Sequence, residues 1–219
     1  MAKDRQASKA SQVVVDNDHI NIAYSNPSTN ALMDMYAKWA KDYDKETVSG
    51  HGYAAPQDAV AGFAKIVTDT NAHILDIGCG TGLAGVLLAA RGYSHIDGAD
   101  LSDEMRAVAA EHGVYQKLFS LDMTDHYGIS DRYDAAMCVG VFGFGPPHIE
   151  HLHHIMGAVK PGAPVVLTVN GAGWNIRGWD DSFAPHMAEH DIELVADTRI
   201  RYLTKEDIDG HLIHLRRAF

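Results

Sequence analysis

Residues 74–82, which read ILDIGCGTG, constrain the fold more than any other part of this sequence. The compact apolar run at 72–77 predicts a buried strand, and the apolar run at 83–90 predicts a helix. Three alternating glycines separate the two runs. A glycine turn of this kind brings backbone N–H groups at the start of a helix close to a ligand. The stretch therefore predicts an α/β fold with a ligand site where this strand ends.

The rest of the chain repeats the alternation of short apolar runs and helical patterns. Repeated β-α-β units predict a mostly parallel sheet with helices on both faces, that is, a doubly wound α/β fold. The last two apolar runs, 192–202 and 211–217, follow each other with only a short connection, which predicts an antiparallel hairpin at one edge. The predicted sheet has seven strands, at 72–77, 95–99, 116–121, 133–139, 163–169, 192–202 and 211–217.

The region before the first strand divides into two parts. Residues 1–29 are polar with little periodicity, and we expect them to form a flexible N-terminal arm, followed by one domain at 30–219. Within 30–70 the pattern becomes helical, and Tyr36, Trp39 and Tyr43 recur at steps of three and four residues on one side of a helix. We expect these helices to form a lid across the carboxyl ends of the strands, where ligands bind in such sheets. The plain alternative is that the aromatic stripe only packs on the core.

Charge and composition exclude several classes of protein. Eighteen Lys and Arg against 29 Asp and Glu give a net charge of −11, which disfavours a nucleic-acid partner. No apolar run approaches the roughly 20 residues of a membrane span, and the start has no apolar signal segment. Two cysteines make neither a disulfide framework nor a four-cysteine zinc site. We therefore expect a cytoplasmic protein without a membrane partner, whose oligomeric state stays open.

The glycine loop is compatible with two kinds of nucleotide cofactor. Gly80, Gly82 and Gly85 satisfy the G-x-G-x-x-G spacing of dinucleotide-binding folds. In those folds, however, the first glycine of the fingerprint directly follows the strand, and here that glycine is Gly78, with Asp76 before it. A carboxylate directed at the loop would repel a pyrophosphate but suits a ligand with an ammonium and a sulfonium group. S-adenosylmethionine is such a ligand.

Further motifs occur in the order expected for one family. Residues 74–82 match the first motif of the class I S-adenosylmethionine-dependent methyltransferases, which the sequence resembles. Asp100 closes the second strand, and Asp122-Met123 follows the third. Tyr133-Asp134-Ala135 opens the fourth strand, and VKPGA at 159–163 precedes the fifth.

The resemblance covers about residues 30–219 and implies a Rossmann-like methyltransferase with S-adenosylmethionine as its cofactor. It implies that Asp100 accepts both ribose hydroxyls and that Asp122-Met123 lies beside the adenine. The segment YAKWAKDYD at 36–44 is similar to small-molecule methyltransferases, nearest to the Williams–Beuren-region methyltransferase-like group. The implied cofactor site consists of Tyr36, Trp39, Tyr43, Asp76, Gly78, Cys79, Gly80, Gly82, Asp100, Leu101, Met105, Asp122, Met123 and Val139.

The acceptor and any catalytic base are less well defined by the sequence. Methyl transfer from a sulfonium mainly requires alignment of the acceptor and exclusion of water. Residues 140–147 lack the Asn-Pro-Pro-aromatic motif of nucleic-acid amine methylases, so we expect a small organic acceptor, with a limited protein or peptide acceptor as the other possibility. His148, which enters the next helix, is the candidate base. His151, His153 and His154 follow it closely, but we expect a helix surface and no metal site.

Two other functions remain open at this point. A non-catalytic protein could keep the same cofactor pocket as a sensor or scaffold. A nicotinamide-dependent oxidoreductase could use the spacing of Gly80 and Gly85.

Overall fold

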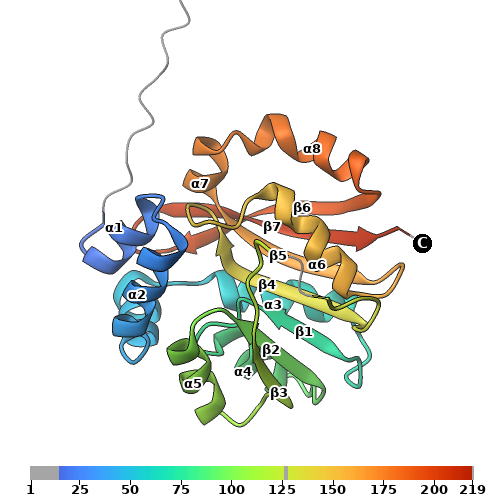
Figure 1. Ribbon diagram of the computed structural model, residues 1–219, viewed down its shortest axis with the longest axis horizontal. Helices are drawn as coiled ribbons and strands as arrows, with labels where there is room; N and C mark the ends of the chain where they lie inside the picture. Colours follow the sequence, from blue (N-terminus) through green and yellow to red (C-terminus); the bar gives the residue numbers. More distant parts are fainter. Residues whose placement is uncertain (1–14, 126–127, 219) are drawn as a thin grey trace, which may run out of the picture.

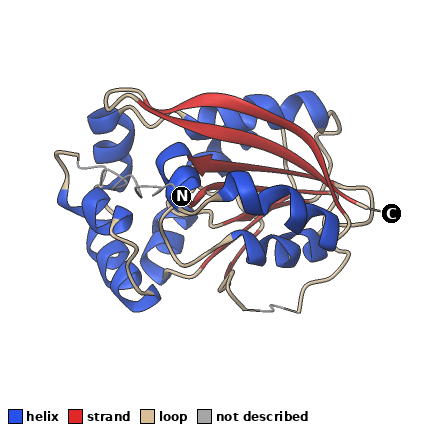
Figure 2. Cartoon of the chain, turned by 90° about the horizontal axis from the view of Figure 1, so that it is seen from above, coloured by secondary structure: helices blue, strands red, loops and turns tan. Residues whose placement is uncertain are grey.

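The computed structural model describes residues 15–125 and 128–218 and contains a seven-stranded sheet with helices on both faces (Figures 1 and 2). The strand order is β3-β2-β1-β4-β5-β7-β6, and only β7 and its two pairings are antiparallel. The predicted doubly wound fold with an edge hairpin is confirmed. The strands are β1 Ile74–Ile77, β2 Ile96–Asp100, β3 Lys117–Ser120, β4 Ala135–Phe142, β5 Pro164–Asn170, β6 Ile192–Leu203 and β7 Ile208–Arg217.

The central strands are apolar throughout because helices cover both of their faces. All four residues of β1 are buried: Ile74 packs in a cluster with α3 and α4, while Leu75 and Ile77 pack in a cluster with α6, α7 and α8. Burial on both faces explains why β1 reads as a continuous apolar run interrupted only by Asp76. The helices are α1 Asp18–Tyr24, α2 Thr29–Trp39, η1 Lys45–Gly50, α3 Ala55–Ile66, α4 Leu83–Ala89, α5 Asp103–Glu111, η2 Ile149–His151, α6 Leu152–Ala158, α7 Gly171–Ile176 and α8 Trp179–Glu189.

The N-terminal region differs from the prediction. Where a flexible arm is expected, residues 18–24 form α1, which packs against α2 through Ile20. Asn17 caps this helix by accepting a hydrogen bond from the Ile20 N–H, and Asn21 is hydrogen-bonded to the backbone of Val15. These asparagines, which make the segment look polar, form local hydrogen bonds that stabilise its fold. The rest of the expected arm, residues 1–14, lies outside the described residues.

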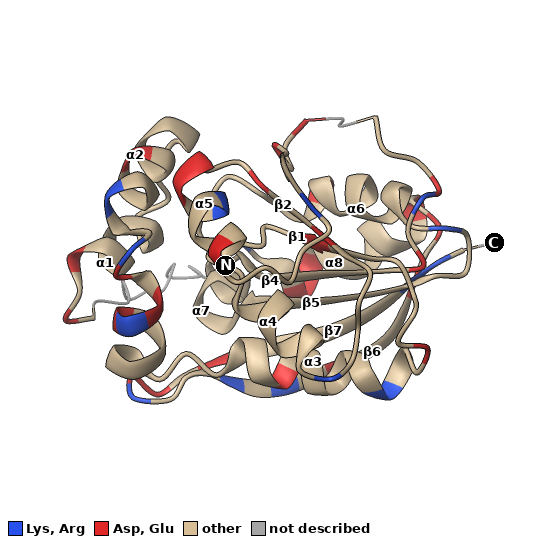
Figure 3. Cartoon of the chain, turned by 90° about the horizontal axis from the view of Figure 1, so that it is seen from below, with Lys and Arg blue, Asp and Glu red and all other residues tan. Residues whose placement is uncertain are grey.

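Helices α1 and α2 lie together beside the sheet, on the left in Figure 1, and the segment from η1 to α3 continues from them into β1. No helix among the described residues is long and apolar enough to cross a membrane. In the view of Figure 3, basic residues are spread over several elements and lie among acidic ones.

Candidate cofactor site

One cavity lies at the carboxyl ends of β1, β2 and β4, under α1 and α2. Thirteen of the fourteen residues predicted to bind the cofactor line this cavity. The exception is Gly82, which stands at the start of α4, where an added Cβ would lie 3.3 Å from Ala109 of α5. The structure therefore brings together nearly all of the residues that the motifs single out.

The glycine loop after β1 has a backbone that only glycine adopts easily. Gly78 and Gly80 have φ angles of 67° and 54°. A Cβ at Gly78 would collide with the side chain of Val141, whereas a Cβ at Gly80 would have no atom within 4 Å. Because Gly80 lines the cavity, that open space is on the side where a ligand would lie. The absence of a side chain at Gly80 thus keeps the cavity open.

Asp100 holds this loop in position from the end of β2. Its Oδ2 accepts a hydrogen bond of 2.9 Å from the Gly80 N–H, and its Oδ1 accepts one of 2.9 Å from the Ser102 N–H. Burial raises the pKa of this carboxyl, and the hydrogen bonds from Ser102 and Gly80 oppose the shift. Each carboxylate oxygen has a second lone pair, so Asp100 can accept further hydrogen bonds from a ligand in the cavity.

Asp76 is the more unusual carboxyl group in the cavity. It is 1% exposed, and its Oδ2 accepts a 2.7 Å hydrogen bond from the Tyr115 hydroxyl. Its Oδ1 is buried and has no hydrogen-bond partner among the described residues. Burial raises the pKa of Asp76 to about 6, the Tyr115 hydrogen bond lowers it, and the charge of Asp100 raises it. A buried carboxylate with a free oxygen is costly unless a cation lies beside it.

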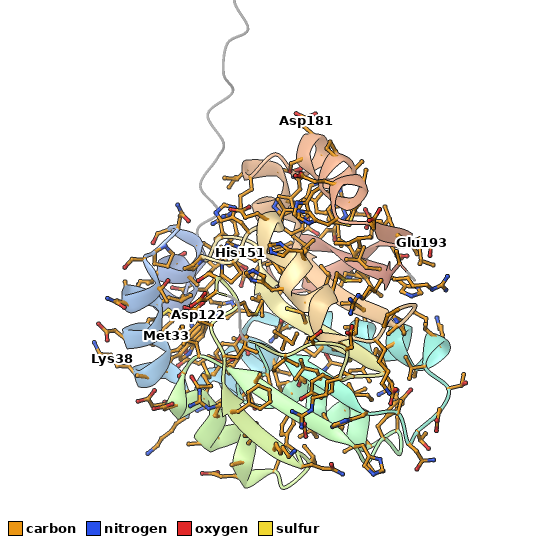
Figure 4. The ribbon with its side chains drawn as sticks, turned by 45° about the vertical axis from the view of Figure 1, so that its right-hand side comes forward. Met33, Lys38, Asp122, His151, Asp181 and Glu193 are labelled. Carbon is orange, nitrogen blue, oxygen red and sulfur yellow. The ribbon has the colours of Figure 1, made fainter. Side chains whose placement is uncertain are left out.

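The wall below β2 and β3 is mostly apolar. Leu101 directly follows β2, the buried Met105 comes from the first turn of α5, and Met123 lies after β3. Asp122 accepts hydrogen bonds from the Thr124 N–H and hydroxyl at 2.8 and 2.7 Å, which stabilise the turn after β3. A flat apolar wall ending in a carboxylate can hold an aromatic base. Figure 4 places Asp122 beside α2.

The aromatic stripe of the expected lid faces both the cavity and a small core. Trp39 stacks at 6.4 Å from Tyr36 and meets the edge of Tyr43 at 4.6 Å, and all three rings line the cavity. Trp39 also packs with α1 and donates a 2.7 Å hydrogen bond to Glu46. The aromatic stripe therefore lines the cavity, as the lid interpretation predicts, and also packs on a core, as the alternative interpretation predicts. Lys38 on the same helix points away from the molecule (Figure 4).

A hydrogen bond connects the lid segment to the glycine loop. The Thr81 hydroxyl donates to Asp44, which lies just before η1. Thr81 is 2% exposed, so this bond is shielded from water. The loop and the segment that covers it therefore hold each other in place.

Sequence reasoning misses the far end of the cavity. Tyr24 of α1 stacks on Phe144 at 4.4 Å and accepts a 2.9 Å hydrogen bond from the Asn170 side chain. Leu32 and Pro147 line the same end. The helical spacing of Ile20, Ala23 and Tyr24 is the one sequence signal for this part, and the polar residues around it conceal that signal.

His148 does not line the cavity, whose wall along this loop ends at Pro147. The guanidinium of Arg177 donates to the His148 ring and to the backbone oxygens of Phe144 and Gly145. Burial and the charge of Arg177 lower the pKa of His148. The expected role as a base at the acceptor therefore has no support from the geometry, and His148 instead helps to anchor the loop after β4. Cys79 lies on the cavity as a buried thiol whose pKa burial raises, so it is no nucleophile.

The comparisons with known proteins agree with this geometry. Residues 74–162 match the family model described as a methyltransferase domain. The human methyltransferase-like protein 27 is 31% identical over 165 residues, which are 72% of this chain and 65% of that protein. The ubiquinone biosynthesis O-methyltransferase of Aeromonas salmonicida is 35% identical over 104 residues, covering 45% of this chain and 43% of that enzyme. The chain thus spans less than two thirds of the length of these relatives.

Solved structures show the same fold at low identity. The [4+2]-cyclase SpnF matches with a TM-score of 0.70 and 17% identity, over 88% of this chain and 97% of that chain. An S-adenosylmethionine-dependent methyltransferase from Mesorhizobium loti matches with a TM-score of 0.58 and 17% identity, over 74% of this chain and 98% of that chain. The matched methyltransferase domain, the methyltransferase relatives and the order of the motifs support a class I S-adenosylmethionine-dependent methyltransferase, and the solved structures show its fold. The cofactor of the class is S-adenosylmethionine, and the unpartnered oxygen of Asp76 and the open space at Gly80 suit it.

Asp76→Asn should change cofactor affinity and stability in opposite directions. An amide keeps the acceptor for the Tyr115 hydroxyl but removes the buried charge that attracts a cation. We expect S-adenosylmethionine to bind at least tenfold more weakly by calorimetry at pH 8, while the ligand-free protein melts at a higher temperature. Asp69→Asn, at an exposed turn, is the control and should change neither value. Unchanged affinity in Asp76→Asn would contradict this role.

The same group predicts a pH dependence. Because the pKa of Asp76 is about 6 in the fold and 3.8 ordinarily, its contribution to stability is fully present below pH 3.8 and is lost as the pH rises through 6. Binding of a cation requires the ionised form, so cofactor affinity should fall about tenfold between pH 7 and pH 5. Calorimetry across this range checks the slope. In Asp76→Asn that part of the slope should disappear, and a fall of equal size in the variant would assign it to another group.

Gly80→Val should abolish cofactor binding by filling the cavity and straining the backbone. Gly113 provides a control for strain alone, because its φ is 65° and an added Cβ there also has no atom within 4 Å, but it lies outside the cavity. We expect both valine variants to lose similar stability, since both need an unfavourable φ. Only Gly80→Val should lose affinity, by about a hundredfold or more. Equal affinities in the two variants would show that the loop does not contact the cofactor.

Proposed function

We propose that this protein transfers the methyl group of S-adenosylmethionine to a small, uncharged and largely apolar acceptor. The observation that supports this most directly is the charge of the cavity. Among the described residues that line it there is no Lys, Arg or His, and its charged groups are Asp76, Asp100 and Asp122. Such a lining attracts a cationic cofactor and repels an acceptor that carries carboxylate or phosphate groups. A ubiquinone-biosynthesis O-methyltransferase among the relatives is in keeping with a small acceptor.

In this proposal each part of the cavity has a separate binding role. Asp100 accepts the ribose hydroxyls, and Asp76 lies toward the cationic portion of the cofactor. Asp122 and Met123 hold the adenine, and Tyr36 and Tyr43 cover the methionine portion. When bound, S-adenosylmethionine supplies an already activated methyl group, so the protein has mainly to orient the acceptor and exclude water.

The acceptor would lie between α1, α2 and the loop after β4. Tyr24, Phe144 and Leu32 form an apolar surface there, and Met33 borders it (Figure 4 labels Met33). Burial raises the pKa of Tyr24, Tyr36 and Tyr43 above the ordinary value, so these phenols stay protonated at neutral pH. They can therefore orient an acceptor by hydrogen bonds, but they do not serve as bases.

The decisive experiment incubates the purified chain with methyl-labelled S-adenosylmethionine and two matched sets of small molecules. One set contains neutral aromatic acceptors, and the other contains their carboxylated counterparts. We expect label to transfer to members of the neutral set only. Cofactor binding without transfer to either set would favour the non-catalytic binding protein. Binding of NADH in place of S-adenosylmethionine would favour the oxidoreductase.

Met33→Lys tests the charge argument within one helix. A cation at the acceptor end should lower kcat/KM for a neutral acceptor about tenfold, because a charged group then faces an apolar ligand. Asp34→Lys is the matched control, since it introduces the same side chain at the exposed neighbouring position. Both variants are assayed at saturating S-adenosylmethionine, so that the difference in kcat/KM reports on the acceptor alone. Equal kcat/KM in the two variants would place the acceptor elsewhere.

A further inference from the structure

Three histidines from two helices meet at a distance from the cofactor cavity. His153 lies on α6, His186 lies on α8, and His190, four residues later, caps the C-terminus of α8 on the same side of that helix. One ring nitrogen from each of the three residues lies within 4.8 Å of the others. Figure 4 marks the start of α6 with His151 and the first turn of α8 with Asp181. None of the three histidines lines the cavity.

Two of the three rings have a nitrogen lone pair available. His153 is hydrogen-bonded through Nδ1 to the backbone oxygen of Glu150, which fixes the tautomer with a free lone pair on Nε2. The Nε2 of His186 is buried and has no hydrogen-bond partner among the described residues. A buried ring nitrogen without a partner is unfavourable unless something binds it.

Burial favours neutral rings, and the nearby carboxylates favour a bound cation. Burial and the neighbouring histidines lower the pKa of His186, and burial, as the largest effect, lowers that of His153. Neutral imidazole is the form that binds metals. The carboxylates of Glu189 and Glu150 lie close enough to act on His186, and they add negative charge around the cluster.

From this cluster we infer a site for one divalent transition-metal ion of the zinc type, held by His153, His186 and His190. Imidazole nitrogens suit zinc, nickel, cobalt and copper, and poorly suit magnesium or calcium. Zinc–nitrogen bonds are about 2.0–2.1 Å long, so the three nitrogens, which lie within 4.8 Å of one another, must come closer together to bind one ion. His153 and His190 are exposed and can do so. Water completes the coordination, since three protein ligands leave one position of a tetrahedron open.

The ion would connect α6 to α8, which together cover one face of the sheet. Phe183 and Met187 of α8 and Ile155 of α6 belong to the same core cluster. A bound ion at the outer side of this contact would stabilise the packing of α6 and α8 on the sheet without taking part in methyl transfer. The sequence predicts no metal site because within 148–154 the histidines lie on one short segment. The partners of His153 lie more than thirty residues later and meet it only in the fold.

The test uses the full chain after treatment with a chelator and dialysis. Zinc, cobalt and magnesium salts are titrated separately by calorimetry, and cobalt binding is also followed by its visible absorption. We expect one equivalent of zinc or cobalt to bind and magnesium not to bind. At a hundredfold excess over Kd, zinc should raise the melting temperature by about 5–10 °C.

Single substitutions locate the ion. His153→Gln and His190→Gln change exposed residues and should each weaken zinc binding at least tenfold, with circular dichroism and S-adenosylmethionine affinity unchanged. His95→Gln, outside the cluster, should bind zinc as the parent chain does. Zinc binding that survives in both cluster variants, or that is lost in His154→Gln instead, would overturn the site. So would the absence of zinc binding by the parent chain. Each of these results is independent of whether methyl transfer occurs.

Discussion

The buried carboxylate of Asp76 and the half-buried carboxylate of Asp100 lie in a cavity that no described basic side chain lines. Burial raises the pKa of Asp76, and the charge of Asp100 raises it further. Within the protein alone this arrangement is unfavourable, and it becomes favourable when a cationic ligand enters. The fit to a cationic cofactor, the proposed preference for an uncharged acceptor and the expected pH dependence all follow from this one electrostatic imbalance.

The glycine loop and the lid enclose the cavity in which these carboxylates lie, and they hold each other in place. Asp100 holds the loop through the Gly80 N–H, and the Thr81 hydroxyl connects the loop to Asp44 beyond α2. The same segment presents the stacked rings of Tyr36 and Trp39 to the cavity. A ligand that binds the loop is therefore covered by groups that the loop itself helps to position. Exclusion of water from the cavity also strengthens each charge interaction inside it.

One face of the sheet has a different organisation. Helices α6, α7 and α8 cover it with large apolar side chains, including Trp174 and Trp179, which pack at 5.3 Å between ring centroids. The histidines of α6 and α8 lie at the outer margin of this layer. Binding at the cavity and binding at the histidine cluster would therefore act on different parts of the fold.

Local sequence determined the order of strands and helices, the glycine loop and the acids at the strand ends. These features depend on neighbours within a few residues: apolar runs bury themselves, and only glycine easily adopts the φ angles of the loop. The carboxyl ends of parallel strands share one edge, so Asp76, Asp100 and Asp122 could be assigned to one site before their distances were known.

Only the tertiary structure decided which distant side chains meet. It brought Tyr24, from a segment with a polar sequence, against Phe144 and Asn170. It turned His148 toward Arg177 and joined His153 to the histidines of α8. Such contacts depend on how helices dock on the two faces of the sheet, which is a sum of many weak packing interactions along the whole chain. No local pattern records that sum, because each helix face fits several neighbours until the others are in place.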